Sequence, residues 1–276
     1  MKRLKLLIVL ISVFTFPVEY LSAAGPSSKT MIFAGSGSNL AITRILADAF
    51  VKTHPGVTIN IPESIGSTGA IRAVFEGAVT IGLISRTFKE QEKKPGVEEV
   101  PYARTLIVLG VHPEVADDDI TFEEIVQIYR GKKTKWKDGN TIIVLTREEG
   151  DSTIDVMNQV IPGFREAHIE SLKTRRWIVT FTDQDMQKLL MTTPNAIGMS
   201  DLGAIKSEHL SIKTLKVNGN SPTAENVLKG RYVLVKTLRF VFKKDKLPPE
   251  AKAFMDFVRS KQGQRTLKQN GYLGGE

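Results

Sequence analysis

The stretch Ile142–Thr153, IIVLTREEGDST, constrains the fold more than any other part of the chain. Its four leading apolar residues, three of them β-branched, predict a short buried strand that ends at Leu145. Arg147 and a polar turn with one glycine follow, and apolar residues at helical spacing then continue to a stop at Pro162-Gly163. This order directs unpaired backbone N–H groups and the positive end of a helix dipole at the turn. Because the arginine adds a planar fork of donors, the stretch predicts half of an anion-binding cleft.

Three further turns at the ends of predicted strands also carry small hydroxyl or amide side chains, at Ser38-Asn39, Ser67-Thr68 and Ser85-Arg86. Each of these turns is ordinary when taken singly, because Gly, Ser and Asn are common turn residues. Strands that alternate with helices indicate an α/β protein with largely parallel sheets, in which ligands bind where strand ends lead into helices. Four such turns, one of them with an arginine, therefore predict a shared anion site.

Local signals predict the ends of several helices. Ser38 or Asn39 is the expected N-cap of the first helix, and Asp183 is the expected N-cap of a later one. Residues Thr121–Glu124 form a capping box, in which the first and last side chains satisfy each other's backbone N–H groups. A charged helix is expected after the third polar turn, up to Lys94.

The first 24 residues have the pattern of a secretory signal peptide. Three bases precede an apolar run from Leu6 to Phe16, and Ser22-Ala23-Ala24 offers small residues for cleavage near Ala24-Gly25. The apolar run is shorter than the ~20 residues that cross a bilayer. The chain has no cysteine, which excludes disulfides and a lipid-modified N-terminal cysteine. We therefore expect an exported, periplasmic protein with no lipid anchor and no transmembrane helix in the mature chain.

The mature length of about 250 residues allows one large domain or two lobes of ~100–150 residues each. Two long apolar strands, Thr105–Val111 and Tyr232–Phe242, are long enough to run from one lobe to another. The second of these strands has Lys236 and Arg239 inside it.

The net charge of the chain limits the possible classes of binding partner only in part. The formal net charge is +8, and without the three bases and one acid of the leader the remaining 35 basic and 29 acidic residues give +6. Such an excess suits nucleic acid, an acidic envelope surface or a small anion. The only basic cluster, Lys132–Lys137, has no aromatic interleaving beyond Trp136, so we interpret it as a solvated loop and expect no nucleic-acid partner. Trp136 and Trp177 are interpreted as packing residues.

The sequence contains no residue pattern that is typical of a metal site or of a catalytic nucleophile. The four histidines lie far apart and have no partner at metal-ligand spacing. The run Asp117-Asp118-Asp119 lacks the glycine and the distal glutamate of a calcium loop. The serines lack the strand–G-x-S-x-G–helix setting of a nucleophile. We therefore expect a binding protein with no metal and no cofactor, rather than an enzyme.

The order and spacing of several motifs resemble the periplasmic solute-binding proteins of phosphate ABC transporters, over nearly all of the mature sequence. The motifs are AGSGSN (Ala34–Asn39), IGSTGA (Ile65–Ala70), IGLISR (Ile81–Arg86), FEEIVQIYRGKKTKWKDG (Phe122–Gly139), TREEGDST (Thr146–Thr153), NAIGM (Asn195–Met199) and AKAFMDFVRSKQGQRTLKQNGYL (Ala251–Leu273). The resemblance implies a two-lobed, type II periplasmic-binding fold, in which each lobe is a mostly parallel sheet flanked by helices. Two crossing strands join the lobes, which close on a dehydrated phosphate. We place lobe 1 in residues 30–108 and 237–276, and lobe 2 in residues 109–236.

The resemblance also implies which residues hold the ligand. Three turns of lobe 1 and one turn of lobe 2 supply them: Ser38, Asn39, Leu40, Ser67, Ser85, Arg147, Asp151, Ser152 and Thr153. Arg86 either contacts the anion as well or pairs with a neighbouring acid. Glu149 stands where the family often has an acid that orients the arginine.

Two positions depart from the family pattern. Some members have an aspartate at the position of Ser85, which accepts a hydrogen bond from the protonated phosphate, whereas others have Ser-Arg as here. The fourth turn usually reads Gly-Ser-Gly-Thr, but this chain has Gly150-Asp151-Ser152-Thr153. Two like unit charges ~4 Å apart repel by about 4 kcal/mol at an effective dielectric constant of about 20. Asp151 therefore either accepts a proton of the ligand, which would select hydrogen phosphate over sulfate, or caps the following helix and points away.

The implied partners are a small oxyanion, with phosphate first, and an ABC permease in the inner membrane, to which a monomeric binding protein would present its closed form. One alternative is a binding protein for a different oxyanion, and another is a sensor or adhesion module that kept the fold without transport. A hydrolase of phosphate esters would need a metal cluster or an activated nucleophile. A polyanion binder would show a steep salt dependence of binding.

Overall fold

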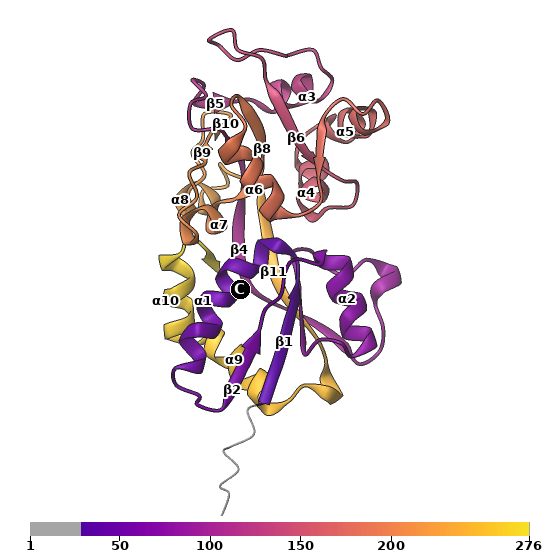
Figure 1. The fold of residues 1–276 in the computed structure, drawn as a ribbon, viewed down its shortest axis with the longest axis vertical. Helices are drawn as coiled ribbons and strands as arrows, with labels where there is room; N and C mark the ends of the chain where they lie inside the picture. The colour runs from indigo at the N-terminus through magenta and orange to yellow at the C-terminus, as the bar shows by residue number, and fades with distance from the viewer. Residues whose placement is uncertain (1–28, 276) are drawn as a thin grey trace, which may run out of the picture.

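In the computed structural model, which describes residues 29–275, the chain forms two α/β lobes joined by two long strands (Figure 1). The expected signal peptide in residues 1–24 lies outside the described residues. Within the described part of the chain, none of the helices combines the length and the apolar character that a membrane crossing requires.

Lobe 1 is built on a parallel sheet with the strand order β2-β1-β3. Apolar side chains of its strands and helices form the core, with Phe33, Leu46 and Phe254 completely buried. The elements of this lobe are β1 (Lys29–Gly35), α1 (Gly37–Val51), β2 (Val57–Asn60), α2 (Gly66–Glu76), β3 (Ile81–Ile84), the 3-10 turn η1 (Glu90–Glu92), the 3-10 turn η2 (Lys244–Lys246), α9 (Pro249–Arg259), α10 (Lys261–Gln269) and β12 (Leu273–Gly274).

Lobe 2 repeats this design around β6, which pairs in parallel with β7 on one side and with β8 on the other. Its core is a separate cluster that includes Leu145, Ile154 and Phe164. The elements are β5 (Asp119–Ile120), α3 (Phe122–Tyr129), β6 (Ile143–Arg147), α4 (Ser152–Val160), α5 (Phe164–Lys173), β7 (Ile178–Thr180), α6 (Asp183–Thr192), β8 (Ala196–Asp201), α7 (Leu202–Ser207), β9 (Lys213–Thr214), β10 (Lys216–Val217) and α8 (Ala224–Leu228).

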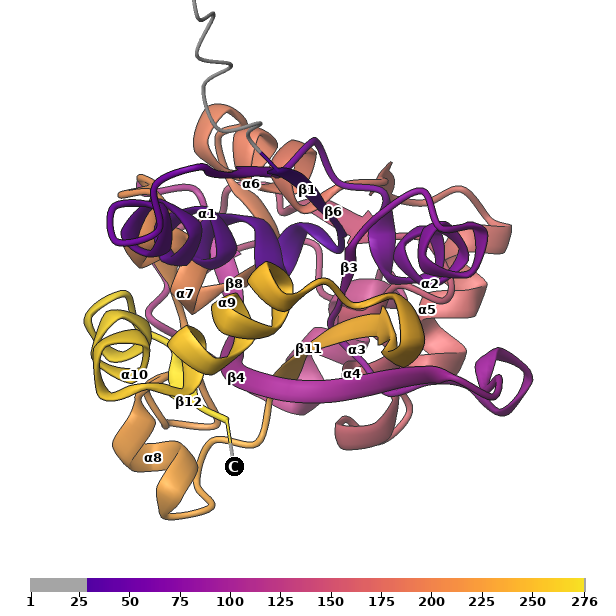
Figure 2. The ribbon, with the colours of Figure 1, turned by 90° about the horizontal axis from the view of Figure 1, so that it is seen from below.

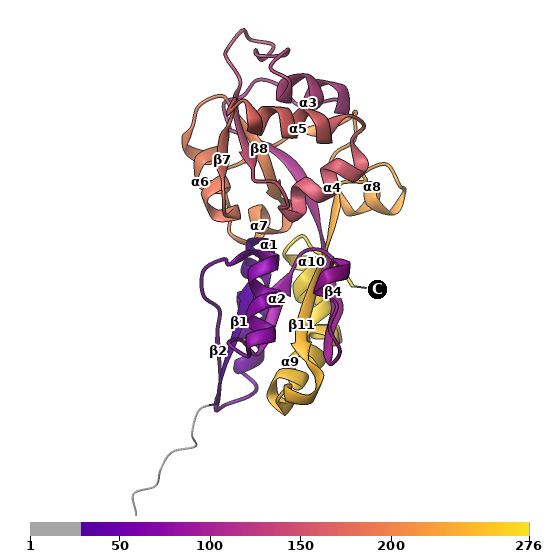
Figure 3. The same ribbon diagram turned by 90° about the vertical axis from the view of Figure 1, so that its right-hand side faces the viewer.

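The two crossing strands are β4 (Val97–Val111) and β11 (Val235–Lys243), which pair with each other in antiparallel orientation. β11 also pairs with β3 of lobe 1, and β4 continues into lobe 2, where it pairs with β8. Figure 3 shows both strands passing between the lobes, and Figure 2 shows β11 between β3 and β4. The expected crossings are therefore confirmed, and the expected lobe boundaries at 108/109 and 236/237 fall inside these strands. The sheet is parallel within each lobe and antiparallel at the crossings.

Two expected helix starts are wrong by one to three residues. The N-cap of α1 is Ser36 rather than Ser38 or Asn39, because the carbonyl of Ser36 already accepts the N–H of Asn39 at 3.0 Å. The N-cap of α6 is Thr182 rather than Asp183, and its hydroxyl accepts the N–H of Asp185. The expected capping box at Thr121 and Glu124 is confirmed at the start of α3.

The charged helix expected up to Lys94 is wrong, because only the single turn η1 forms there. The carboxylate of Glu92 accepts hydrogen bonds from the guanidinium of Arg86 and from the backbone N–H of Lys89. These bonds fold the segment back on itself instead of letting it continue as a helix. The two expected packing residues are confirmed: Trp136 is buried and Trp177 half-buried, and each indole N–H donates to a backbone carbonyl.

Candidate functional site

Helix N-termini from both lobes meet at one pocket of about 130 Å³. The first turns of α1 and α2 reach it from lobe 1, and those of α4 and α6 reach it from lobe 2. The first N–H groups of a helix have no partner within the helix, and the helix dipole adds a partial positive charge there. The pocket is therefore suited to an anion. The residues that line it are Ser36, Gly37, Ser64, Ile65, Gly66, Ser67, Thr68, Arg147, Glu148, Gly150, Asp151, Ser152, Phe181 and Asp183.

Arg147, the last residue of β6, is the cation on the pocket wall, and it is only 5% exposed. Its Nε and Nη2 donate to Oδ2 of Asp151 at 3.2 and 2.7 Å. Its Nη1 is buried and has no hydrogen-bond partner among the described residues. The carbonyl of Arg147 accepts a hydrogen bond from Nε2 of the buried His168 at 2.9 Å, which holds the end of the strand in place. One arm of the guanidinium thus remains available to a ligand.

Asp151 is the N-cap of α4, because its Oδ1 accepts the N–H of Thr153 at 2.8 Å. Burial alone would raise the pKa of Asp151, but the charges of Arg147 and Lys236 outweigh burial and hold this pKa below its ordinary value. Asp151 therefore caps the helix as one of the two alternatives expected, but it does not point away, because its carboxylate lines the pocket and contacts Arg147. Gly150, with φ at +86°, makes the tight turn that brings this carboxylate back onto the arginine.

The acid that contacts Arg147 is Asp151, and not Glu149 as predicted. Glu149 is exposed, whereas Asp151 is the carboxylate in contact with the guanidinium. The reason is geometric: the side chain at the N-cap points back at the end of β6, and the side chain in the middle of the turn points outward.

Lobe 1 contributes a network of neutral side chains behind the pocket. Asn39 donates from Nδ2 to the hydroxyl of Ser85 at 3.0 Å, and Ser85 donates to the hydroxyl of Ser36 at 2.6 Å. The hydroxyl of Tyr102 donates to Oδ1 of Asn39, and the N–H of Ser85 donates to the hydroxyl of Ser67. Ser67 lines the pocket, whereas Asn39 is completely buried among these partners.

Two further predicted ligands of lobe 1 are directed away from the pocket. The side chain of Leu40 is completely buried in the core of lobe 1, so its backbone alone could reach a ligand. Arg86 pairs with Glu92 at 2.6 and 2.7 Å and donates to the hydroxyl of Thr68 at 3.1 Å. Of the two roles considered for Arg86, the structure shows pairing with the acid.

Lys236, in the crossing strand β11, is a buried cation between the two lobes, and it was not among the site residues predicted from the sequence. Its ammonium group lies 2.6 Å from the hydroxyl of Ser38, 2.9 Å from that of Thr153 and 3.1 Å from the carboxylate of Asp201. Ser38 and Thr153, two of the predicted ligands, are thus brought together across the cleft. A lysine inside a largely apolar strand was the available signal, because a buried charge needs partners, although Arg239 in the same strand gives the same signal.

Asp183 is a second group that the prediction left out of the site. It lines the pocket, and a Cβ on Gly37 would come within 2.4 Å of its Oδ2, so the glycine permits this close approach. Burial raises the pKa of Asp183 above its ordinary value, although Lys236 and Arg147 act in the opposite direction. None of the hydrogen bonds among the described residues uses its side chain. Asp183 is therefore a carboxylate on the pocket wall that is free to meet a ligand, and unlike that of Glu148 it belongs to a residue that is not exposed.

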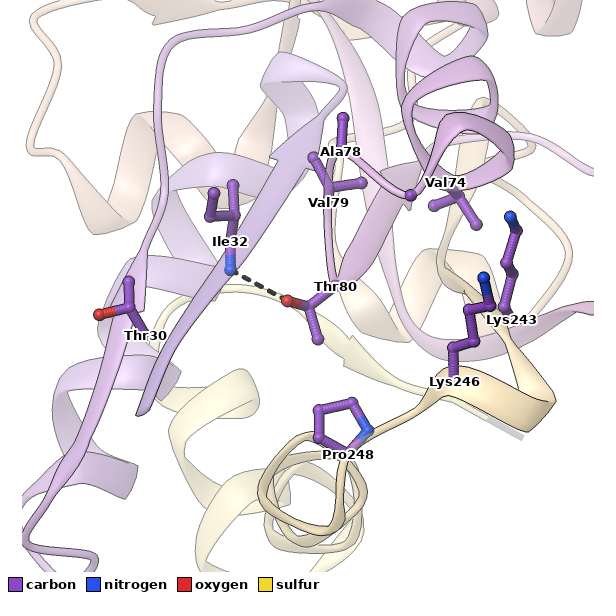
Figure 4. A pocket seen from close by; sticks show the side chains of 10 residues that line it. Thr30, Ile32, Val74, Ala78, Val79, Thr80, Lys243, Lys246 and Pro248 are labelled. Carbon is purple, nitrogen blue, oxygen red and sulfur yellow. Dashed lines mark hydrogen bonds between the residues drawn. The ribbon is translucent and has the colours of Figure 1, made fainter. Parts of the chain in front are cut away.

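A larger cavity of about 310 Å³ lies in lobe 1, where Thr30 and Ile32 of β1 line it (Figure 4). It contains none of the predicted ligands, and its Lys243 donates to the carbonyl of Phe75 at 2.7 Å. We therefore place the functional site in the pocket between the lobes. In the described part of the chain, no three His, Asp or Glu side chains are grouped so that they could hold a metal ion.

Comparison with known proteins shows which protein family this chain resembles. The model of the PBP superfamily domain matches residues 22–262. The phosphate-binding protein PstS of Borreliella burgdorferi is 22% identical, over 98% of this chain and 99% of that protein. PstS of Bacillus subtilis is 23% identical, over 90% of this chain and 81% of that protein.

Among solved structures, the chain is similar to a Clostridium perfringens protein described as a substrate-binding protein of a phosphate ABC transporter, with bound phosphate. The two are 29% identical and superpose with a TM-score of 0.80, over 90% of this chain and 100% of that one. This likeness agrees with the two-lobed fold that the strand order indicates.

Proposed function

The chain belongs to the PBP superfamily, and from this premise we propose that it captures hydrogen phosphate between its lobes for import by an ABC transporter. The observation that carries the proposal is the free Nη1 of Arg147, in a pocket where helix N-termini of both lobes converge. The bound phosphate of the similar Clostridium perfringens structure supports the choice of oxyanion.

We assign the direct contacts to groups that face the cleft from both lobes. Arg147, Ser67 and Ser152 line the pocket. Ser38 and Thr153 directly follow the lining residues Gly37 and Ser152 in the chain, and their hydroxyls meet at Lys236. Neutral donors and helix N-termini bind an anion without a full countercharge for each of its charges. Asn39 is less suited to direct contact than predicted, since both its backbone N–H and its side chain are engaged within lobe 1.

The proton of hydrogen phosphate requires an acceptor, and sulfate has no such proton at neutral pH. Both oxygens of Asp151 already accept hydrogen bonds, from Arg147 and from the N–H of Thr153. Asp183 lines the same pocket and makes no such bond among the described residues. We therefore assign the reading of the ligand's proton to Asp183.

Calorimetric titration of the mature protein tests this function. Phosphate is expected to bind, and sulfate, at the same pH and ionic strength, is expected to bind more weakly. A thermal-shift screen with molybdate, tungstate and phosphonates extends the comparison, because a ligand bound only by the folded state raises its melting temperature. Binding of one of these anions with no binding of phosphate would contradict the proposed ligand and support the alternative oxyanion.

The transport role, including the permease partner and the site of action outside the cytoplasm, is tested in cells. Deletion of the gene is expected to lower the uptake of labelled phosphate during phosphate limitation, and the wild-type gene is expected to restore it. The R147M variant, expressed at the same level, serves as the matched control that folds but does not bind. Unchanged uptake after deletion would favour the sensor or adhesion module.

A further inference from the structure

Lys236 occupies an unusual position for a lysine, because it lies on a strand that belongs to both lobes and is only 1% exposed. Its ammonium group contacts one hydroxyl from lobe 1, that of Ser38 at 2.6 Å. From lobe 2 it contacts the hydroxyl of Thr153 at 2.9 Å and both carboxylate oxygens of Asp201, at 3.1 and 3.2 Å. Three groups that are distant in sequence and come from both lobes therefore share one cation.

The contacts account for every donor that the ammonium group has. A lysine carries three N–H donors and no acceptor, and here they are directed at two hydroxyls and one carboxylate. The cation is therefore fully engaged by the protein. Asp201 is as buried as Lys236, and the two charges compensate each other. Burial alone would lower the pKa of Lys236, but the carboxylates of Asp201, Asp183 and Asp151 outweigh burial and raise it, so the group stays charged.

This arrangement determines what the two hydroxyls can do. A hydroxyl has one proton to donate and lone pairs to accept with. Since an ammonium group can only donate, the oxygens of Ser38 and Thr153 are its acceptors, and their own protons must point elsewhere. No other side-chain hydrogen bond joins these two hydroxyls to the described residues. Both protons are thus left for a further acceptor in the cleft.

We propose that Lys236 is a positioning residue of the oxyanion site, which joins the lobes across the cleft and turns the hydroxyl protons of Ser38 and Thr153 toward the bound anion. This inference rests on the proposed function for the identity of the anion. Without the lysine, each hydroxyl could turn its proton to a neighbouring acceptor and present a lone pair to the ligand, which repels an anion. The lysine therefore fixes both hydroxyls as hydrogen-bond donors to the ligand before the ligand binds.

The first test is a double-mutant cycle measured by calorimetric titration with phosphate. Because K236M alone would leave Asp201 as a buried unpaired charge, all variants carry D201N, which keeps an acceptor for the lysine. In the D201N protein, T153V is expected to weaken phosphate binding about tenfold or more, the worth of one hydrogen bond to a charged group. In D201N/K236M, which itself binds more weakly, T153V is expected to cost less than about threefold, since the hydroxyl is no longer held as a donor.

Equal costs of T153V in both backgrounds would overturn the proposal, because a lysine that only supports the fold does not act through Thr153. If D201N/K236M does not fold, K236Q in the D201N background keeps the stem and a neutral donor, and the same comparison applies. The matched control is K243M. Lys243 lies on the same strand and donates to the carbonyl of Phe75 in lobe 1, so its loss is expected to leave phosphate affinity unchanged.

The second test uses small-angle scattering and requires no ligand. D201N/K236M is expected to have a larger radius of gyration than D201N and K243M, because the connection from Ser38 to Thr153 is broken. Saturating oxyanion is expected to bring the radius back. Equal radii of the ligand-free proteins would overturn the proposal. Failure of the wild-type protein to bind phosphate would contradict the proposed function instead. The scattering comparison would still test whether Lys236 joins the two lobes.

Discussion

The two lobes contribute unlike chemistry to the same pocket. Lobe 1 supplies neutral groups at the wall, with Ser36 and Ser67 and the N-termini of α1 and α2. Lobe 2 supplies the charges, with Arg147, Glu148, Asp151 and Asp183. On the proposed function, we expect lobe 1 to offer donors to any oxyanion, and lobe 2 to determine how strongly the anion is held and whether its proton is recognised.

The difference has a consequence for mutational effects. A single hydroxyl that donates to an anion contributes about 1.5–3 kcal/mol. The guanidinium of lobe 2 adds a full positive charge and more than one donor. Substitutions in lobe 2 are therefore expected to change binding more than substitutions in lobe 1.

The largest effect is expected for R147M, which should weaken phosphate binding by more than about a hundredfold, since it removes charge-assisted donors. Calorimetric titration measures the loss, and circular dichroism verifies the fold. R176M is the matched control: Arg176 is also in lobe 2 and donates to the carbonyl of Tyr129 and to Glu170, away from the pocket. A loss of threefold or less in R147M would remove the basis of the comparison between the lobes.

A smaller effect, on selectivity, is expected for D183N. Its amide can donate to either oxyanion, so the preference for phosphate over sulfate should fall about tenfold, as for one charge-assisted bond. Affinities for the two anions at the same pH give this ratio. D185N is the control, because Asp185 lies on the same helix but accepts from the hydroxyl of Thr182. An unchanged ratio would show that another group reads the ligand's proton.

The D183N variant also tests how the stability of the folded protein depends on pH. Since the pKa of Asp183 is raised in the folded state by burial, its ionisation opposes folding. The stabilising effect of the protonated form is complete below the ordinary pKa of aspartate, about 4, and is lost as pH rises through the raised folded value. D183N is expected to melt at a higher temperature than wild type at neutral pH, and the difference should shrink toward pH ~4. A difference that grows on acidification would contradict the sign.

In lobe 1, S67A is expected to weaken phosphate binding about tenfold, the worth of one hydroxyl that donates to a charged ligand and therefore less than the loss of the guanidinium. The control T53A removes an exposed hydroxyl that donates to the carbonyl of Phe50 in the same lobe. A loss in S67A as large as that in R147M would break the distinction between a neutral and a charged lobe.

The smallest effect is expected for R86M, which should leave phosphate affinity within about twofold, because Arg86 does not line the pocket. Its guanidinium is engaged by Glu92 in the structure. Calorimetric titration checks this, with E92Q as the companion variant. A tenfold loss in R86M but not in E92Q would restore Arg86 to the ligand set.

Much of the fold was predictable because its signals are local. The apolar runs of the crossing strands and the capping box at Thr121 each depend on residues a few positions apart. Helix starts were less certain, because Ser36, Ser38 and Asn39 are all able to cap and neighbouring contacts decide among them. The orienting acid was misassigned between Glu149 and Asp151 for the same reason, since sequence spacing does not state which way a turn faces.

The sequence by itself determined the alternation of strands and helices, the two crossings and the turn with Arg147, because periodicity and turn chemistry act over a few residues. Only the tertiary structure decided the partners of the buried charges. The groups around Lys236 lie 35, 83 and 198 residues away along the chain, so nothing in their local sequence indicates that they share one ammonium group. The effect of a buried charge depends on the groups that surround it, and these groups come together only when both lobes have folded.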